Sequence, residues 1–282
     1  MKNEGQSGRL TNQQKVSHGV SGILNDETKF HDTKVSNISK SVQSLLEEDF
    51  PTLTFRYRKS ILKQEINAAL QKADKALGQT LFVDKAEIKP DGGILEVKDD
   101  NDQWRVILVS EAKYQGKDIE NIRTGKQVGI KNDQDLMTAG NAIERAYKNI
   151  SEMANYMLSE NYFPYVLFLE GSNFLTKDIT VIRPDGREVT LKYRSGALNR
   201  LDRLTASNYG MSINQNLCVN KQILLNGNYV MLQATSIYTK GNGDRWGRTE
   251  MTEIMLDIAK TSLKMLGKDL FTQLTSNKEI SR

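Results

Sequence analysis

The sequence predicts an α/β fold with a central mixed β-sheet that is covered by helices on both faces. Candidate strands and helices alternate along the chain. Two candidate strands, residues 106–110 and 165–169, are apolar at nearly every position, as strands buried on both faces are. The chain has 282 residues and 38% hydrophobic content, which is enough for one sizeable core. We therefore expect a single α/β domain over residues 1–282.

Two kinds of periodicity place the elements. Apolar residues three or four positions apart predict helices, and alternating or continuous apolar runs predict strands. The predicted helices cover 36–48, 60–77, 143–157, 196–208 and 249–266. The predicted strands cover 80–83, 94–98, 104–113, 163–169, 180–193 (an exposed ribbon about the turn at 184–186) and 229–238. A polar turn at 99–102 joins two of them into a hairpin, and Asn141 is the expected N-cap of the third helix.

Cysteine count and hydropathy narrow the class of protein. The only cysteine, Cys218, excludes an intrachain disulfide and favours a reducing, cytoplasmic compartment. One cysteine and two histidines cannot build a structural zinc site of the usual kinds. No apolar run reaches the roughly 18–20 residues that a membrane helix needs. Residues 1–14 are polar and lack the apolar core of a signal peptide.

Basic residues gather in two segments, although the net charge of +4 is modest. Residues 113–131 and 183–205 each contain more basic than acidic side chains and few apolar ones. The basic members are Lys113, Lys117, Arg123, Lys126, Lys131, Arg183, Arg187, Lys192, Arg194, Arg200 and Arg203. This pattern favours surfaces that face a polyanion. A mildly basic chain is more often an ordinary globular protein, so the charge alone does not identify a partner.

The strand over 104–113 ends in two charges. Because side chains alternate on a strand, Glu111 and Lys113 share a face with Ile107 and Val109, and the opposite face holds Val106, Leu108, Ser110 and Ala112. Such charges form either a simple ion pair or part of a site. The position of Asp91 favours a functional site, because this residue lies in the turn that opens the preceding strand. A hairpin places the start of one strand beside the end of its neighbour.

Two carboxylates and a lysine at one edge of a sheet suit Mg²⁺ chemistry. Mg²⁺ keeps several waters and takes one or two carboxylates together with substrate phosphate. A neighbouring lysine can orient or deprotonate the attacking water. Asp91 and Glu111 are therefore the expected metal ligands, and Asp91, Glu111 and Lys113 the expected catalytic residues. The similar E-x-K triplets at 87–89 and 96–98 lie too near Asp91 in the chain, or before it, to form such a site.

Longer motifs surround this constellation. P-D at 90–91 followed by E-A-K at 111–113 is the signature of PD-(D/E)xK nucleases. Around it stand I-K-P-D-G-G at 88–93, D-Q-D-L-M at 133–137, A-G-N-A-I-E-R at 139–145 and N-R-L-D-R-L-T at 199–205. Together these motifs resemble the EcoRI family of type II restriction endonucleases. The resemblance covers roughly residues 9–275 and is weakest at the termini and across 221–228.

The resemblance implies a fold, an activity and partners. It implies a PD-(D/E)xK nuclease core with DNA-embracing arms at 113–135 and 176–195 and an N-terminal arm at 1–20. It implies a homodimer on double-stranded DNA, because each subunit of a two-fold dimer reads half of a palindrome. The expected activity is Mg²⁺-dependent cleavage of GAATTC after the G, which leaves 5′-phosphates. The expected setting is the bacterial cytoplasm, with a cognate DNA methyltransferase in the same restriction system.

The resemblance also implies DNA contacts, residue by residue. Residues 137–142 correspond to a segment in the major groove, where small residues let the backbone approach bases and asparagine pairs with adenine. The expected base-reading residues are Met137, Thr138, Gly140, Asn141, Ala142, Glu144, Arg145, Arg200 and Arg203. The expected phosphate contacts are Lys89, Lys117, Lys148 and Asn149. The alternative for Glu144 and Arg145 is a solvated helix face, and for the two later arginines it is phosphate contact without sequence readout.

Three residues depart from the family pattern. Tyr114, Thr138 and Lys192 stand where that pattern has histidine, alanine and glutamate. Thr138 adds a hydroxyl near the bases, and Lys192 adds a sequence-independent attraction to phosphate. We therefore expect the same GAATTC site with weaker discrimination against near-cognate sites.

Other functions fit parts of the sequence. A PD-(D/E)xK nuclease with structural specificity, such as a repair or resolving enzyme, shares the carboxylates but does not need the segment at 137–145. A catalytically silent DNA-binding protein does not need Asp91, Glu111 and Lys113. A metal hydrolase of another kind leaves the two basic segments unexplained.

Overall fold

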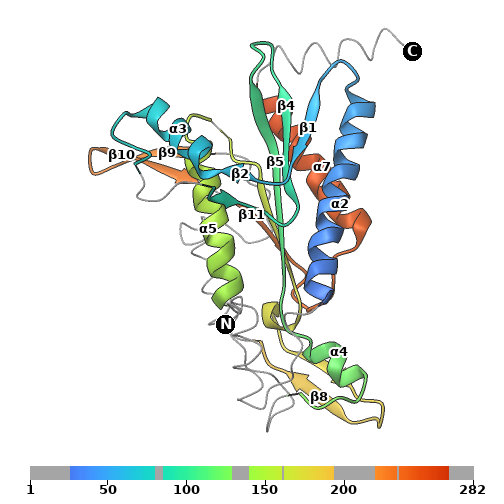
Figure 1. Ribbon diagram of the computed structural model, residues 1–282. Coiled ribbons are helices and arrows are strands. Elements are labelled where there is room, and N and C mark those ends of the chain that lie inside the picture. Colours follow the sequence, from blue (N-terminus) through green and yellow to red (C-terminus); the bar gives the residue numbers. More distant parts are fainter. Residues whose placement is uncertain are drawn as a thin grey trace, which may run out of the picture.

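The computed structural model describes residues 26–79, 85–128, 140–160, 162–193, 220–233 and 235–266. Its centre is a five-stranded sheet with the order β1-β4-β5-β6-β11 (Figure 1). The strands are β1 (Phe55–Arg58), β4 (Gly93–Lys98), β5 (Trp104–Tyr114), β6 (Tyr165–Glu170) and β11 (Ser236–Thr239). Neighbours are antiparallel from β1 to β5 and parallel from β5 to β11. The predicted mixed sheet is therefore confirmed.

Helices cover both faces of this sheet, as the sequence predicts. The long helices α2 (Asp26–Asp49) and α7 (Arg248–Met265) pack on one face, and α5 (Gly140–Tyr156) packs on the other with α3 (Lys63–Ala73) beside it (Figure 1). The core of the α5 face includes Ile94, Val109, Ala146, Ile150, Met153 and Leu167. The core of the α2 and α7 face includes Val42, Leu46, Leu108, Phe168, Met255 and Ile258. The two apolar strands β5 and β6 are buried because each face has its own helical layer.

A β-bulge places two residues of β5 on the faces opposite to those that the sequence predicts. The pairing of β4 with β5 shifts register between Leu95 and Glu96. As a result Val106 joins the core on the α5 face, and Ile107 joins the core on the α2 and α7 face. The sequence alternation predicts the reverse for these two residues. Val109 and every later residue of β5 keep their predicted faces, because the bulge lies before them.

A smaller unit extends from the end of β5. It contains α4 (Asp118–Arg123) and a ribbon of β7 (Ile179–Ile182) and β8 (Glu188–Leu191), and it lies below the sheet in Figure 1. The unit has its own apolar cluster, made of Ile119, Ile122, Val128, Leu175, Val181, Val189 and Leu191. The described parts of the two expected arms, 113–135 and 176–195, therefore pack together rather than standing apart.

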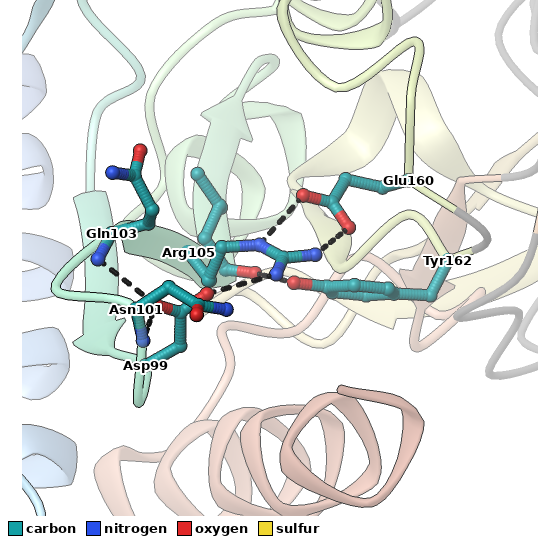
Figure 2. Close-up of polar contacts among 7 residues, drawn as sticks. Asp99, Asn101, Gln103, Arg105, Glu160 and Tyr162 are labelled. Carbon is teal, nitrogen blue, oxygen red and sulfur yellow. Dashed lines mark hydrogen bonds and ion pairs between the residues drawn. The ribbon is translucent and has the colours of Figure 1, made fainter. Parts of the chain in front are cut away.

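The other end of β5 carries a polar cluster (Figure 2). Arg105 forms two hydrogen bonds to Glu160, at 2.9 and 2.5 Å, and one to Asp99 at 3.1 Å. Asp99 also accepts hydrogen bonds from the backbone N–H groups of Asn101 and Gln103. The cluster therefore fixes the hairpin turn between β4 and β5 to the segment that follows α5.

Some predicted elements differ from the observed ones. The predicted helix over 60–77 is split, because Ile61 and Leu62 form β2 (Ile61–Leu62), which pairs with β3 (Glu87–Ile88) before α3 begins. The predicted strand over 229–238 is two strands, β10 (Asn228–Gln233) and β11, and β10 forms a hairpin with β9 (Asn220–Leu225). Helix α5 begins at Gly140, so Asn141 lies inside the helix and is not its N-cap.

Further elements were not predicted, and some predictions cannot be compared. Strands β1, β3 and β9, helix α4 and the short 3-10 helix η1 (Ser172–Phe174) have no counterpart in the sequence-based assignment. The predicted strand at 80–83, the predicted helix at 196–208, the arm at 1–20 and Cys218 lie outside the described residues. Within the described ranges, no helix is long and apolar enough to cross a membrane.

Candidate active site

The turn at 90–93 holds Asp91 against the end of β5. Gly92 N–H donates to the Ser110 carbonyl at 2.9 Å, and Gly93 N–H donates to the Pro90 carbonyl at 2.9 Å. A Cβ atom at Gly92 would collide with Ser110 Oγ, and Gly93 adopts φ +78°, which favours glycine. The turn therefore approaches β5 closely and brings Asp91 beside the residues that follow Ser110.

Asp91, Glu111 and Lys113 converge as the sequence predicts. Lys113 Nζ lies 2.7 Å from Asp91 Oδ2 and 2.5 Å from Glu111 Oε1. The side chain of Glu111 is completely buried, whereas those of Asp91 and Lys113 are 17% and 15% exposed. Solvent therefore reaches the group from the Asp91 and Lys113 side.

Two further side chains hold Glu111. The Tyr165 hydroxyl donates a short hydrogen bond to Glu111 Oε2 from the first residue of β6. Asn149 Nδ2 donates to Glu111 Oε1 at 3.2 Å from helix α5. Sequence reasoning missed both interactions. A signal existed for Tyr165, because a tyrosine in a wholly apolar strand needs a partner for its buried hydroxyl.

Burial and neighbouring charges set the protonation of this group. Burial raises the pKa of Glu111, and the Asp91 carboxylate adds to this effect, so the pKa lies above its ordinary value despite the attraction of Lys113. Burial works to lower the pKa of Lys113, but Glu111 and Asp91 outweigh it, so the pKa lies above its ordinary value and the side chain stays charged. Burial and the Glu111 carboxylate raise the pKa of Tyr165, so its hydroxyl stays protonated and acts as the hydrogen-bond donor to Glu111.

The two carboxylates can hold a divalent cation. Asp91 Oδ2 and Glu111 Oε1 both contact Lys113 Nζ, at 2.7 and 2.5 Å, so the two carboxylates lie close together on either side of the ammonium. Among the described residues, no group of three or more histidine, cysteine, aspartate and glutamate side chains could hold a metal ion. Two carboxylates suit Mg²⁺, which completes its coordination with waters and phosphate oxygens.

Some of the residues expected to contact DNA lie on α5, and others lie before β4 or α4. Glu144, Arg145 and Lys148 are exposed on α5, and Ala142 is half-buried near its start. Lys89 forms an ion pair with Glu87, and Lys117 is half-buried immediately before α4. Gly140 and Asn141 are the first residues of α5. Met137, Thr138, Arg200 and Arg203 lie outside the described residues.

The described ribbon exposes less positive charge than its count of basic residues suggests. Arg183 is buried and donates to the Lys126 carbonyl at 3.0 Å, so it joins the ribbon to the segment that follows α4 and does not lie on an exposed basic surface. Arg187 pairs with Asp185 at 2.8 Å, and Lys192 pairs with Asp178 at 2.7 Å. Acidic neighbours therefore balance the two exposed cations of the described ribbon.

Tyr114, which departs from the family pattern, lies at the junction with the smaller unit. The Arg245 guanidinium lies 4.4 Å from the centre of the Tyr114 ring. The same guanidinium forms an ion pair with Glu120 of α4 at 3.1 Å. Tyr114 therefore shares a cation with α4.

The fold and the site together define a class of protein. A mixed sheet with an aspartate at the turn before one strand, and Glu-x-Lys at the end of the next, has the arrangement of PD-(D/E)xK nucleases. Comparison with known proteins gives the family, because the model of the family "Restriction endonuclease EcoRI" matches residues 17–273. The chain belongs to the EcoRI family of restriction endonucleases. This membership implies a divalent metal cofactor and double-stranded DNA as the partner.

Two relatives match over nearly their whole length. The chain is 63% identical over 276 residues to the type II restriction enzyme EcoRI of Escherichia coli, which covers 98% of this chain and 100% of that protein. It is 48% identical over 269 residues to the type II restriction enzyme RsrI of Cereibacter sphaeroides, which covers 95% of this chain and 96% of that protein.

Proposed function

We propose that this protein is a type II restriction endonuclease that hydrolyses both strands of double-stranded DNA at GAATTC, after the G. The observation that carries the proposal is the convergence of Asp91, Glu111 and Lys113 at one sheet edge, with Nζ–O distances of 2.7 and 2.5 Å. The two type II restriction enzymes that match over 95% or more of the chain support the same activity. The protein acts as a single domain on each half-site of a palindrome, and two copies form the active dimer.

The catalytic group divides the work among its residues. Asp91 and Glu111 would hold Mg²⁺, and the bound ion would supply positive charge beside the phosphate and lower the pKa of a coordinated water. Lys113 remains an ammonium between the two carboxylates, so it orients the attacking water and neutralises charge. Glu111 is completely buried, so bulk water does not reach this carboxylate. A cognate DNA methyltransferase in the same host protects the chromosome.

DNA recognition is assigned to the side of the molecule from which α5 begins. Glu144 and Arg145 are exposed at the first turns of α5 and read bases together with Met137, Thr138, Gly140, Asn141, Ala142, Arg200 and Arg203. Lys89, Lys117 and Lys148 contact phosphates, and the unit of α4 and the ribbon embraces the duplex. These phosphate contacts set the salt dependence of binding.

One experiment tests the function. A plasmid with a single GAATTC is incubated with the protein in Mg²⁺ or in EDTA, beside an Asp91→Ala variant. We expect linear plasmid only from the wild type in Mg²⁺. Random nicking would instead support a nuclease of structural specificity, and a mobility shift without cleavage would support a silent DNA-binding protein.

A second experiment tests the weaker discrimination expected from Thr138 and Lys192. Lys192 is exposed and paired with Asp178, so a glutamate there would add repulsion on the DNA side and lose this pair. A double variant, Lys192→Glu with Thr138→Ala, should raise the ratio of cognate to near-cognate cleavage at fixed salt. An unchanged ratio would remove the idea.

A further inference from the structure

Helix α2 packs against the turn that carries Asp91, on the face of the sheet opposite to α5. A Cβ atom placed on Gly92 would lie 2.7 Å from Val35 Cγ1 of α2 and 2.1 Å from Ser110 Oγ of β5. Both distances are too short for a side chain to fit unless its neighbours shift. The turn therefore lies in direct contact with α2 and β5, and a movement of either would displace it.

A pair of buried hydroxyl groups joins α2 to β5 beside this turn. Ser39 Oγ lies 2.8 Å from Ser110 Oγ. Because Ser39 Oγ also donates to the Val35 carbonyl at 3.2 Å, the Ser110 hydroxyl is the donor of the pair. The carbonyl of the same Ser110 accepts from Gly92 N–H at 2.9 Å. One residue of β5 therefore holds α2 by its side chain and the turn by its backbone.

Tyr57 occupies the space where a side chain of Gly93 would stand. A Cβ atom placed on Gly93 would lie 2.5 Å from the Tyr57 hydroxyl oxygen and 2.6 Å from ring atoms Cε2 and Cζ. Tyr57 belongs to β1 and pairs with Leu95 of β4. Its hydroxyl lies 2.9 Å from Ser36 Oγ of α2, and Lys40 Nζ lies 5.4 Å from the centre of its ring. Tyr57 therefore supports the turn from β1 and is itself held by α2.

The two expected metal ligands are held in different ways. The Glu111 carboxylate is buried and accepts hydrogen bonds from Tyr165 and Asn149. The Asp91 carboxylate is 17% exposed and contacts Lys113 Nζ at 2.7 Å. An aspartate side chain is short, so the backbone of the turn determines where the Asp91 oxygens lie. Since a misplacement of about 1 Å can cost about 100-fold in rate, the contacts that hold this backbone bear on the reaction.

We propose that Ser39 and Tyr57 are positioning residues for Asp91. Ser39 acts through Ser110, which fixes the turn to β5, and Tyr57 acts through its contact with Gly93. Both hold the backbone of the turn from the α2 face of the sheet, so that the Asp91 carboxylate reaches the cation. This inference rests on the proposed function, because it requires Asp91 to hold the metal.

The first test removes the Tyr57 ring. Tyr57→Ala takes away the support of Gly93 and should lower the single-turnover rate of GAATTC cleavage by about 10- to 100-fold, as the loss of outer-shell partners of metal ligands does. Affinity for the GAATTC duplex in EDTA should equal that of the wild type. Tyr57→Phe keeps the ring and should stay within about fivefold of the wild-type rate. The matched control is Tyr238→Ala, which loses a ring from the same core, 5.8 Å from the ring of Phe168.

The second test removes the Ser39 hydroxyl. Ser39→Ala breaks the link from α2 to Ser110, so the same cleavage rate should fall by about three- to tenfold, the size of one hydrogen bond. The matched control is Ser262→Ala, which removes a buried hydroxyl of α7 that donates to the Ile258 carbonyl at 2.9 Å. Helix α7 packs on the same face of the sheet as α2, and this control should keep the wild-type rate.

Amide hydrogen exchange in EDTA reports the position of the turn without DNA or metal. The N–H groups of Gly92 and Gly93 each donate to a carbonyl at 2.9 Å, which protects them from exchange while the turn keeps its place. Exchange at these two amides should be about tenfold faster in Tyr57→Ala and Ser39→Ala and unchanged in the two controls. A lower cleavage rate without faster exchange there, or an equal fall in rate in the controls, would overturn the inference.

The two measurements separate this inference from the proposed function. If the wild type does not cut GAATTC in Mg²⁺, the proposed function fails, and exchange at Gly92 and Gly93 still tests whether the two side chains hold the turn. If the wild type cuts, a rate within about twofold of it in Ser39→Ala or in Tyr57→Ala overturns the role of that residue. Where Tyr57→Ala does not fold, Tyr57→Leu takes its place, because leucine keeps apolar volume without the ring and the hydroxyl.

Discussion

Strand β5 carries one cation between two carboxylates at each of its ends. Near its start, Arg105 joins Asp99 and Glu160, with contacts of 3.1 and 2.5 Å (Figure 2). Near its end, Lys113 joins Asp91 and Glu111 at 2.7 and 2.5 Å. The composition of the two groups is nearly the same, yet only the second has the arrangement of a nuclease site.

The difference lies in the burial of the carboxylates and in the balance between burial and the donors around them. Burial works to raise the pKa of Asp99, but hydrogen bonds from backbone N–H groups and Arg105 outweigh it, so the pKa lies below its ordinary value. Glu111 is completely buried, and its pKa lies above its ordinary value. A second cation would offset the burial of the charged form of Glu111, whereas at Asp99 the hydrogen bonds and Arg105 already outweigh burial. Perturbed carboxylates of this kind mark functional sites.

The largest expected effect comes from the Lys113 end. Lys113→Ala removes the ammonium that both carboxylates share and that orients the water. The single-turnover rate of GAATTC cleavage should fall by about 10²- to 10⁴-fold. A rate within about tenfold of the wild type would show that Lys113 is structural, like Arg105.

The corresponding change at the other end should affect stability and not cleavage. Arg105→Ala removes a forked donor from Asp99 and Glu160, so the free energy of unfolding in urea should fall by about 1–3 kcal/mol. The cleavage rate per folded molecule should stay within about twofold, because Arg105 lies about 26 Å along the strand from Lys113. A large loss of cleavage in fully folded protein would contradict the separation of the two ends.

The pH dependence of stability should have opposite signs at the two ends. Because the folded pKa of Glu111 is raised, its contribution to stability is present below the ordinary glutamate pKa and is lost as the pH rises through the raised value. Because the folded pKa of Asp99 is lowered, its contribution is present above the ordinary aspartate pKa and is lost as the pH falls. In EDTA, Glu111→Gln should flatten the first dependence and Asp99→Asn the second, as measured by urea unfolding across pH. If the contributions of Glu111 and Asp99 to the free energy of unfolding changed with pH in the same direction, the two ends of β5 would not differ as proposed.

The smallest effect is expected from Arg105→Lys. Lysine keeps the positive charge but loses the planar fork that meets both oxygens of Glu160. The free energy of unfolding should fall by about 0.5–1.5 kcal/mol, less than for alanine. Thermal unfolding of the wild type, Arg105→Lys and Arg105→Ala measures this difference. If the two variants were equally stable, the positive charge itself would contribute nothing to stability.

Sequence reasoning succeeds where one strand or one turn determines the structure. Alternation along β5 and the glycines after Asp91 are local features, and they predict the meeting of Asp91, Glu111 and Lys113. The bulge that exchanges the faces of Val106 and Ile107 depends on the pairing of two strands, which alternation within one strand does not reveal.

The remaining errors arise from contacts between distant parts of the chain. The hydrogen bond from Asn149 to Glu111 joins α5 to the end of β5, and the pattern along α5 alone does not reveal it. Arg183 belongs to a basic segment, but the packing of the ribbon on α4 buries it. Ile61 has helical spacing with later residues, but it pairs with Ile88 in a short sheet. Tertiary packing overrides local pattern in all three cases.

The central claim is that the Lys113 group is the metal-dependent site and the Arg105 group is structural. The most direct test compares Glu111→Gln with Asp99→Asn on a plasmid bearing one GAATTC, in Mg²⁺ and with both proteins shown to be folded. Each substitution replaces one carboxylate by an amide of the same size. We expect wild-type linearisation from Asp99→Asn and no linear product from Glu111→Gln. Cleavage by Glu111→Gln at the wild-type rate, or its loss in Asp99→Asn, would contradict the account.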